Sequence, residues 1–173
     1  MQNEYVVLVD EKNNETGVME KMEAHRSGKL HRAISVFIYN SKGELLMHKR
    51  AAGKYHSAGL WTNTCCSHPR PGEDAREAAM RRLQEEMGMT CNLVHAFDFT
   101  YKAELENGLT EHEFDHVFTG ISDALPAPNP DEVEAWEYIC EEDIALELRD
   151  NPELFTVWFR MIYPNLTPQT IVA

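Results

Sequence analysis

Short runs rich in β-branched and aromatic residues recur along this chain, and turn-forming residues bound most of them. Such runs are typical of β-strands, and glycine-containing turns at 40–43 and 106–108 join two pairs of them into expected hairpins. A proline-rich loop at 126–130 leads into the last run. Strands are predicted over residues 5–9, 33–39, 44–48, 97–103, 111–120 and 134–140.

A helical period replaces the strand pattern in the middle of the chain. Ala79, Leu83 and Met87 recur every four residues, which places them on one face of a helix. Gly88 can end that helix, because glycine adopts the left-handed conformation of a C-cap at little cost. The pattern therefore predicts a helix that opens at 71–74 and runs to about Met87.

Further helices are predicted nearer the ends of the chain. One lies near 142–148 and another covers 152–162, where Asn151 can cap the helix and Pro152 suits its first position. Residues 19–26 fit either a short helix or an ordered loop. No repeat, low-complexity tract or linker interrupts the pattern, so one α+β domain of all 173 residues is expected.

Composition is that of a globular protein and limits the possible partners. With 173 residues, 43% of them hydrophobic, the chain can bury a core of its own. The net charge of −13 disfavours nucleic acid but permits a small anion held by clustered basic residues. No apolar run reaches the length of a membrane span, no signal-peptide pattern opens the sequence, and four cysteines form no disulfide framework. We therefore expect a cytoplasmic protein with no membrane segment and with reduced thiols.

Histidines and glutamates supply the first candidate site, a metal centre. Glu111 and Glu113 are two apart on a predicted strand, so they share a face where a bound cation would remove their repulsion. Three imidazoles would complete a mixed nitrogen and oxygen shell, which suits manganese, magnesium or zinc. Taken singly, each histidine is more commonly structural and each glutamate solvated. The candidate ligands are His25, His31, His68, Glu111 and Glu113.

The end of the central helix is the second candidate. Arg82 and Glu86 lie one turn apart and share a face. The ordinary interpretation is an ion pair worth about 0.3–0.5 kcal/mol. The functional one has Glu86 holding a magnesium ion that also binds diphosphate oxygens, since magnesium is commonly held by one or two carboxylates together with substrate phosphates. On the helix alone, the ordinary interpretation is favoured.

The adjacent cysteines are the third candidate. If residues 62–66 are extended, Cys65 and Cys66 face opposite sides, so only one of them can enter a pocket. Core packing is the usual role of a buried cysteine, whereas proton chemistry requires a partly accessible thiol whose pKa is tuned by its surroundings.

The helix over residues 73–88 resembles the Nudix signature, which builds a site for a diphosphate and metal ions. Ser67 replaces the signature glycine, and Arg82 replaces the first glutamate of its Arg-Glu pair. Because Arg82 removes a metal-binding carboxylate and adds a positive charge, the expectation of a hydrolase is weakened. The matching positions are Glu73, Arg81, Leu83, Glu85, Glu86 and Gly88.

Three more motifs resemble the type I isopentenyl diphosphate isomerases, a family of the Nudix superfamily. They are a cysteine motif at 61–69, a glutamate motif at 110–113 and an early histidine motif at 30–33. Their joint occurrence in this order is specific, and the similarity extends along nearly the whole chain. The resemblance implies a Nudix-like α/β/α sandwich with a mixed central sheet. It also implies the interconversion of isopentenyl and dimethylallyl diphosphate through a carbocation-like state.

The resemblance further implies a role for each matching residue. The catalytic residues would be Cys66, Glu113 and Tyr101, and which of Cys66 and Glu113 is the acid stays open. One divalent metal would bind the histidine and glutamate group, and Glu86 would hold magnesium together with the substrate. The substrate contacts would be Lys21, Arg50, Lys54, Arg82 and Trp158.

The implied partner is a small isoprenoid diphosphate, and a monomer or weak dimer is expected. Two other functions stay open. A Nudix-type diphosphate hydrolase would release phosphate or a monophosphate. A non-catalytic metal-binding or ligand-sensing module would bind the substrate without turnover, and its Cys66 would be replaceable.

Overall fold

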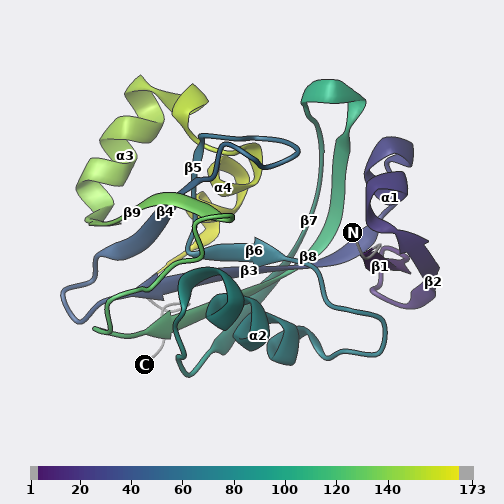
Figure 1. The fold of residues 1–173 in the computed structure, drawn as a ribbon, viewed down its shortest axis with the longest axis horizontal. Coiled ribbons are helices and arrows are strands. Elements are labelled where there is room, and N and C mark those ends of the chain that lie inside the picture. Colours follow the sequence, from purple (N-terminus) through teal and green to yellow (C-terminus); the bar gives the residue numbers. More distant parts are fainter. Residues whose placement is uncertain (1–3, 168–173) are drawn as a thin grey trace.

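A mixed β-sheet runs through the centre of the computed structural model, which describes residues 4–167 (Figure 1). Its strands are β1 (Tyr5–Val9), β2 (Glu15–Glu20), β3 (His31–Tyr39), β4 (Leu45–Arg50), β5 (Trp61–Thr62), β6 (Cys65–Ser67), β7 (Val94–Glu104), β8 (Thr110–Ile121) and β9 (Val133–Ile139). The long strand β3 pairs with β1, β4 and β6 in antiparallel orientation and with β8 in parallel orientation. β7 extends the sheet beyond β8, and β9 pairs with β4.

Helices cover both faces of this sheet (Figure 1). The helices are α1 (Lys21–Ser27), α2 (Ala75–Met87), α3 (Glu141–Asp150) and α4 (Val157–Ile162). α2 covers one face, while α3 and α4 cover the other. The β1–β2 hairpin and α1 lie together at the end of the sheet away from α3 and β9. The expected α+β class, with an α/β/α sandwich around a mixed sheet, is confirmed.

Two hydrophobic clusters lie on opposite faces of β3, because successive side chains of a strand alternate. Ile34 and Val36 pack against α2 residues such as Leu83, whereas Phe37 packs with Phe159 of α4. The odd-numbered residues of β3 therefore share the face that α4 covers. His31, at the start of β3, belongs to that same set and faces the site described below.

Most predicted elements are present, with small shifts at their ends. β1 has the predicted bounds, and β3 begins two residues earlier than predicted, at His31. Of residues 19–26, predicted as a short helix or an ordered loop, 19 and 20 end β2 and the rest belong to α1. The first turn of α1 is capped by the Glu20 side chain, which accepts from the Glu23 amide. Gly28 ends α1 at a φ of 59°, the left-handed conformation that glycine adopts readily.

The strand β2 and the very short strands β5 and β6 are absent from the predicted set. β5 and β6 have only two and three residues, too few to show a period. They are strands because distant residues pair with them, as Ser35 of β3 does with Cys66. Such pairing cannot be read from a local pattern.

The predicted helix over 152–162 is wrong in its first half. A short 3₁₀ turn covers Pro152–Leu154, and Phe155 is extended and bridges Trp61 before α4 begins. Asn151, the predicted cap, makes no capping hydrogen bond. Thr156 caps α4 instead, its hydroxyl accepting from the Phe159 amide at 3.4 Å.

The reason for this difference is burial. Phe155 is only 5% exposed and packs in the cluster under α4, which an uninterrupted helix from residue 152 would not allow at this backbone geometry. The Thr156 hydroxyl also donates to the Thr62 hydroxyl at 3.0 Å, so the new helix start is fixed to β5. Within residues 4–167, no helix is both long enough and apolar enough to pass through a bilayer.

Candidate active site

The register of three neighbouring strands places three polar side chains in one row. Glu113 of β8 lies opposite His31 of the parallel strand β3 and opposite Tyr101 of the antiparallel strand β7. Directly opposed residues point to the same face of a sheet, so the three side chains are neighbours. The Tyr101 hydroxyl donates a hydrogen bond to Glu113 Oε2 at 2.7 Å, and both residues are buried.

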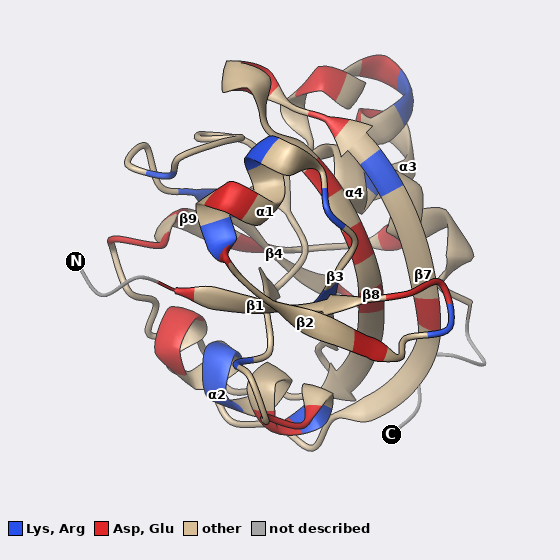
Figure 2. Ribbon diagram, turned by 90° about the vertical axis from the view of Figure 1, so that its right-hand side faces the viewer, with Lys and Arg blue, Asp and Glu red and all other residues tan. Residues whose placement is uncertain are grey.

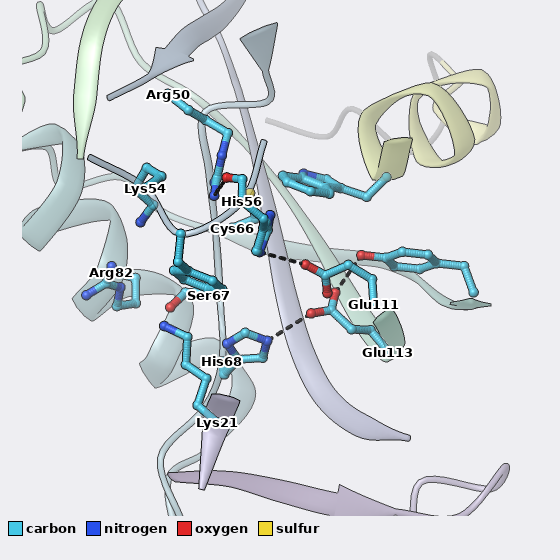
Figure 3. Close-up of a pocket in the computed structure, with 13 residues that line it drawn as sticks. Lys21, Arg50, Lys54, His56, Cys66, Ser67, His68, Arg82, Glu111 and Glu113 are labelled. Carbon is cyan, nitrogen blue, oxygen red and sulfur yellow. Dashed lines mark hydrogen bonds and ion pairs between the residues drawn. The ribbon is translucent and has the colours of Figure 1, made fainter. Parts of the chain in front are cut away.

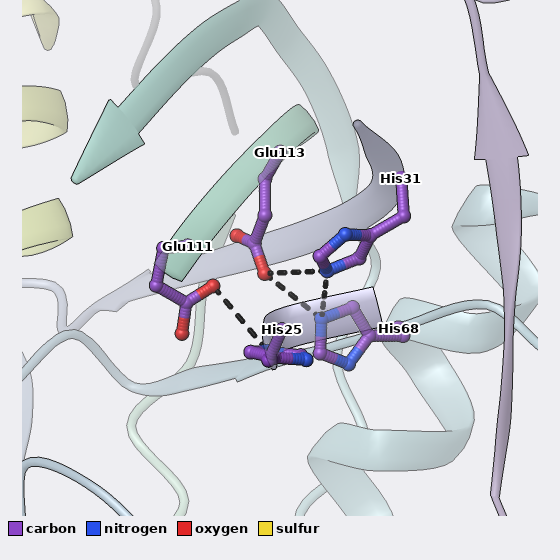
Figure 4. A group of neighbouring side chains, drawn as sticks. All are labelled: His25, His31, His68, Glu111 and Glu113. Atoms are coloured by element: carbon purple, nitrogen blue, oxygen red, sulfur yellow. Dashed lines mark hydrogen bonds and ion pairs between the residues drawn. The ribbon is translucent and has the colours of Figure 1, made fainter. Parts of the chain in front are cut away.

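A five-residue group, which we call the His/Glu cluster, forms around this row (Figure 4). Glu111 lies two residues before Glu113 on β8 and shares its face. α1 supplies one histidine and the segment after β6 supplies another. One ligand atom from each member lies within 4.8 Å of the others. The members are His25, His31, His68, Glu111 and Glu113.

Two histidines of the cluster are held with Nε2 toward its centre. Nδ1 of His25 lies 2.7 Å from the Lys21 carbonyl, and Nδ1 of His31 lies 2.7 Å from the Lys29 carbonyl. A carbonyl only accepts hydrogen bonds, so each Nδ1 carries a proton, and Nε2 is the nitrogen through which the ring can bind a metal. Metal-binding histidines are typically held in this way by their second nitrogen.

Two of the inward-facing atoms lack the hydrogen bonds that buried polar groups normally make. His25 Nε2 and Glu111 Oε2 lie 3.6 Å apart, and neither has a hydrogen-bond partner among residues 4–167. His68 Nε2 lies 2.8 Å from Glu113 Oε1 and 3.3 Å from His31 Nε2. Three imidazole nitrogens and two carboxylates that converge in this way, two of their atoms without a partner among residues 4–167, fit a divalent metal ion.

Burial and charge separate the two carboxyls of the cluster. Burial, together with the charge of Glu111, raises the pKa of Glu113 above its usual range. Burial acts the same way on Glu111, but the contacts from His25 and His56 prevail and hold the pKa of Glu111 well below its usual range. Two neighbouring carboxyls with pKa values pushed apart are a typical acid and base arrangement.

A pocket adjoins the cluster and collects most of the predicted site residues (Figure 3). Its walls come from α1, the loop after β4, β6, α2, β7, β8 and α4. Of the predicted residues, His25, His31 and Glu86 are not part of its lining. The lining residues are Lys21, Arg50, Lys54, Tyr55, His56, Cys66, Ser67, His68, Arg82, Tyr101, Glu111, Glu113 and Trp158.

The two adjacent cysteines lie in different surroundings. Cys65 is fully buried and packs with the α2 side chains, whereas Cys66 lines the pocket. β6 is extended where it pairs with β3, and this pairing turns the two side chains to opposite faces. Burial raises the pKa of the Cys66 thiol to about 12, although Arg50 acts in the opposite direction.

Three of the four predicted diphosphate contacts are paired with carboxylates. Lys21 Nζ lies 2.6 Å from Glu4 Oε2, and Lys54 forms a short ion pair with Glu132. The third contact is Arg82 on α2, whose guanidinium lies 3.3 Å from the carboxylate of the same Glu132. These cations are therefore neutralised locally.

Arg50 is different, because no carboxylate of residues 4–167 lies within ion-pair distance of it. It is 6% exposed, its Nε has no hydrogen-bond partner there, and one terminal nitrogen donates to the His56 carbonyl at 3.2 Å. Its guanidinium lies 5.1 Å from the ring centre of Trp158. A buried, unpaired guanidinium at a pocket wall is suited to an anionic ligand.

Glu86 lies at the end of α2, outside the His/Glu cluster. Its Oε1 accepts from Arg82 at 2.5 Å, and its side chain is buried. Burial raises its pKa above the usual range, despite the opposing charge of Arg82. The carboxylate and guanidinium therefore sit as a half-buried pair beside the pocket.

Three lining residues were not among the predicted site residues. Tyr55 and His56 follow Lys54 in the loop between β4 and β5, and Ser67 was noted only as a departure from a signature. The available signal was proximity in sequence, since these residues lie next to Lys54 and Cys66. The contact of His56 with Glu111 depends on the path of the loop, which the sequence does not reveal.

Comparison with known proteins gives one family and several close relatives. The profile described as "NUDIX domain" matches residues 29–159. An isopentenyl-diphosphate Delta-isomerase of Pectobacterium atrosepticum is 53% identical over 161 residues, which cover 93% of this chain and 90% of the relative. An isopentenyl-diphosphate Delta-isomerase 1 of Aromatoleum aromaticum is 56% identical over 153 residues, 88% of this chain and 86% of the relative.

Solved structures share the same fold at lower sequence identity. A protein from Deinococcus radiodurans is 22% identical in sequence and superposes with a TM-score of 0.73. The aligned region covers 86% of this chain and 90% of that protein. A MutT protein from Methanosarcina mazei is also 22% identical and superposes with a TM-score of 0.65. The aligned region covers 79% of this chain and 91% of the MutT protein. These two likenesses concern the fold alone.

Proposed function

The chain belongs to the Nudix family and, within it, to the isopentenyl-diphosphate Delta-isomerases, and on this basis we propose that it interconverts isopentenyl and dimethylallyl diphosphate. It is an enzyme that moves one double bond within its substrate. This assignment is supported by sequence identities of 53% and 56% with two isopentenyl-diphosphate Delta-isomerases, over most of each chain. The Nudix hydrolase alternative has no comparable relative among those compared above.

The reaction needs an acid on one side of the alkene and a base on the other. One proton is added to the terminal methylene, which leaves a cationic tertiary carbon. Another proton is removed from the CH₂ group on the other side of that carbon, so the double bond shifts with no net change in composition. We assign these steps to Cys66 and Glu113, because both line one pocket from different strands. An alkene is a very weak base, so the acid must be closely positioned in a site that excludes water.

Several features support these two roles. The raised pKa of Cys66, about 12, keeps its thiol protonated near neutral pH. Tyr101 donates to Glu113 Oε2 and so fixes the orientation of the carboxyl. Which residue gives the proton and which takes it reverses with the direction of the reaction.

The His/Glu cluster is the proposed site of one divalent metal ion, manganese, magnesium or zinc. Bound there, the ion would act as a Lewis acid that lowers the proton affinity of Glu113 and cancels its repulsion with Glu111. The proposal is supported by the inward-directed Nε2 atoms of His25 and His31 and by the unpartnered atoms of His25 and Glu111. The proposed ligands are His25, His31, His68, Glu111 and Glu113.

The basic residues of the pocket are proposed to hold the diphosphate. Arg50 has no competing carboxylate among residues 4–167, so it is the natural first contact. The other three basic residues must release their carboxylate partners before they can bind phosphate oxygens. They are Lys21, Lys54 and Arg82. Glu86 is proposed to bind a magnesium ion that arrives with the diphosphate, which would also release Arg82 from its ion pair.

Trp158 is proposed to stabilise the developing carbocation with its π-face. Its Nε1 donates to the Thr62 hydroxyl at 2.9 Å, which fixes the ring plane at the pocket wall. A desolvated cation over such a ring gains about 2 kcal/mol. The ring also excludes water, which would otherwise trap the cation as an alcohol.

Proton NMR in deuterated water with isopentenyl diphosphate and magnesium tests the function. The expected result is allylic methyl signals of dimethylallyl diphosphate that carry deuterium. Release of phosphate or a monophosphate would indicate the hydrolase instead. Binding without turnover, with an unchanged Cys66→Ala variant, would indicate a ligand-sensing module. The cytoplasmic location and the monomeric or weakly dimeric state stay predictions.

A further inference from the structure

One buried histidine contacts the His/Glu cluster without belonging to it. His56, in the loop between β4 and β5, is 4% exposed, and its Nε2 lies 3.1 Å from Glu111 Oε1 (Figure 3). It is not a member of the five-residue group whose ligand atoms converge. It therefore approaches Glu111 from outside, at the oxygen that does not face His25.

The hydrogen bonds around His56 define its tautomer. An ionised carboxylate only accepts, so the nitrogen facing Glu111 must be the protonated Nε2. Nδ1 is then an acceptor, and the Ser57 hydroxyl lies 3.2 Å from it as a donor. The Ser57 hydroxyl therefore donates to Nδ1, and Nε2–H donates to Glu111 Oε1. Glu111 Oε2, which faces His25, keeps no hydrogen-bond partner among residues 4–167.

The surrounding side chains hold the His56 ring in place. The ring stands edge-on to Trp158, with centroids 5.7 Å apart and planes at 89°. It stands at the same angle to Tyr55, at 4.4 Å. The carbonyl of His56 also accepts from Arg50 at 3.2 Å. The His56 ring therefore contacts both Trp158 in the pocket wall and Glu111 in the His/Glu cluster.

The backbone beside His56 is strained in a way that fixes this orientation. Ser57 has a φ of 49°, a conformation that residues other than glycine rarely adopt, and it is nearly buried. Its amide donates to the Glu106 carboxylate, which stabilises the turn from the tip of the β7–β8 hairpin. Strain of this kind persists only where the surroundings enforce it, and it is concentrated at functional sites.

We propose that His56 is a positioning residue that orients Glu111 for the metal and couples the metal centre to the Trp158 wall. Its Nε2–H donates to Glu111 Oε1 and so holds the carboxylate with Oε2 directed at His25. The inference rests on the proposed metal role of the His/Glu cluster. Groups outside a metal shell that orient a ligand commonly change metal affinity about 10–100-fold when they are removed.

Two substitutions separate the hydrogen bond from the packing. His56→Phe keeps a flat ring against Trp158 but has no donor, whereas His56→Gln offers an amide N–H near the position of Nε2. Titration calorimetry of metal-free protein with Mn²⁺ should give a Kd that His56→Phe weakens about 10–100-fold. His56→Gln should recover most of that loss. Thermal melting of the metal-free variants checks that both are folded.

His95→Phe makes the same exchange at an exposed position of β7 that does not line the pocket. Because His95, Asp98 and His116 form a second group whose ligand atoms converge, this variant also measures any Mn²⁺ bound outside the His/Glu cluster. It should bind Mn²⁺ in the cluster as the unmodified protein does. A folded His56→Phe variant with unchanged affinity would overturn the inference. So would equal losses in His56→Phe and His56→Gln, since the donor would then be irrelevant.

The same preparations distinguish this inference from the proposed function. If the unmodified protein binds Mn²⁺ and His56→Phe binds it more weakly, the positioning role stands even where no isomerisation is detected. If the unmodified protein isomerises its substrate but does not bind Mn²⁺, the inference fails while the function stands. A His56→Phe loss confined to kcat, with Mn²⁺ affinity intact, also contradicts it.

Discussion

The thiols of Cys65 and Cys66 point to opposite faces of β6, and this divides packing from chemistry at adjacent positions. Cys65 fills the core under α2, where burial raises its pKa well above the usual range. Cys66 lines the pocket that also holds Glu113 and Tyr101. A single peptide unit therefore separates a residue that stabilises the fold from one proposed to move a proton.

Cys66→Ala should nearly abolish isomerisation, while Cys65→Ala should keep most of it. Loss of a positioned acid or base typically lowers the rate about 10²–10⁴-fold. Removing the buried Cys65 sulfur leaves a small cavity and costs about 1–2 kcal/mol of unfolding free energy. Turnover of isopentenyl diphosphate and urea unfolding measure the two effects. Equal loss of turnover in two folded variants would contradict the division.

Tyr101→Phe tests the orientation of Glu113. The variant keeps the ring in the core but removes the donor to Glu113 Oε2. We expect kcat to fall about 10-fold or more, while unfolding free energy changes by about 1–2 kcal/mol. An unchanged kcat in the folded variant would show that the hydroxyl has no part in proton transfer.

At the scale of the elements, hydrogen bonds and ion pairs at helix ends decide where helices begin. α4 begins at Thr156, which caps the Phe159 amide and also donates to Thr62 of β5. α2 begins at Asp74, whose carboxylate accepts from the amides of Arg76 and Glu77. Both caps position helices that carry residues of the pocket wall.

Thr156→Ala should destabilise the protein more than Asn151→Ala does. Loss of an N-cap costs about 1–2 kcal/mol, and the Thr62 hydroxyl would lose one of its buried hydrogen bonds as well. Asn151 makes no capping bond, so its substitution should cost under about 0.5 kcal/mol. Urea unfolding compares the two, and an equal cost would restore the helix start at residue 152.

The ion pair of Glu73 and Arg81 should make stability depend on pH on the acidic side. The hydrogen bond from Arg81 lowers the pKa of Glu73 below its ordinary value of 4.5. Its stabilising effect is therefore complete above about pH 4.5 and is lost as pH falls through the lowered folded-state pKa.

Glu73→Gln should accordingly reduce stability at neutral pH by about 1–2 kcal/mol, with a smaller difference from the unmodified protein at acidic pH. Glu77→Gln, at an exposed position of α2, serves as the control. Unfolding free energies between pH 3 and 7 provide the comparison, and two parallel curves for Glu73→Gln and the unmodified protein would refute this linkage.

At the scale of the whole molecule, the His/Glu cluster joins segments far apart in the sequence. It draws on α1, β3, the segment after β6, and β8. In Figure 2, α1 and the β1–β2 hairpin lie across these strands, with basic and acidic residues interspersed on α1 and α2. A cation bound in the cluster would therefore hold α1 to the β3, β6 and β8 part of the sheet.

Metal removal should lower the thermal stability of the entire protein. A ligand that binds only the folded state stabilises it by an amount that grows with the logarithm of its concentration over Kd, about 2.7 kcal/mol at 100 times Kd. The Tm should fall after chelation and rise again with added Mn²⁺, and Glu111→Gln should reduce this rise. A Tm that does not respond to Mn²⁺ would contradict a metal site in the cluster.

Much of the fold could be predicted from local patterns, and the exceptions have a common cause. The period of four in α2 and the alternation at Glu111 and Glu113 are local, so β8 and α2 were predicted nearly as they are. β6 and the start of α4 depend on pairing with distant residues such as Ser35 and Trp61. No window of the sequence contains both partners.

The candidate site divides in the same way. Its motif residues were predicted from resemblance, and their roles stay proposals. The contact of His56 with Glu111 and the carboxylate partners of Lys21 and Lys54 were not predicted. Each of these contacts joins a loop or helix to an element at least 17 positions away in the chain.

By itself, the sequence determined the α+β class, the strand alternation and the set of residue types able to hold a metal and a diphosphate, because these follow from local periodicity and side-chain chemistry. Only the tertiary structure decided which groups meet. The parallel register of β3 and β8 sets His31 beside Glu113, and the strained loop brings His56 to Glu111. Register and loop path are fixed by packing between distant segments, and that packing exists only in the folded chain.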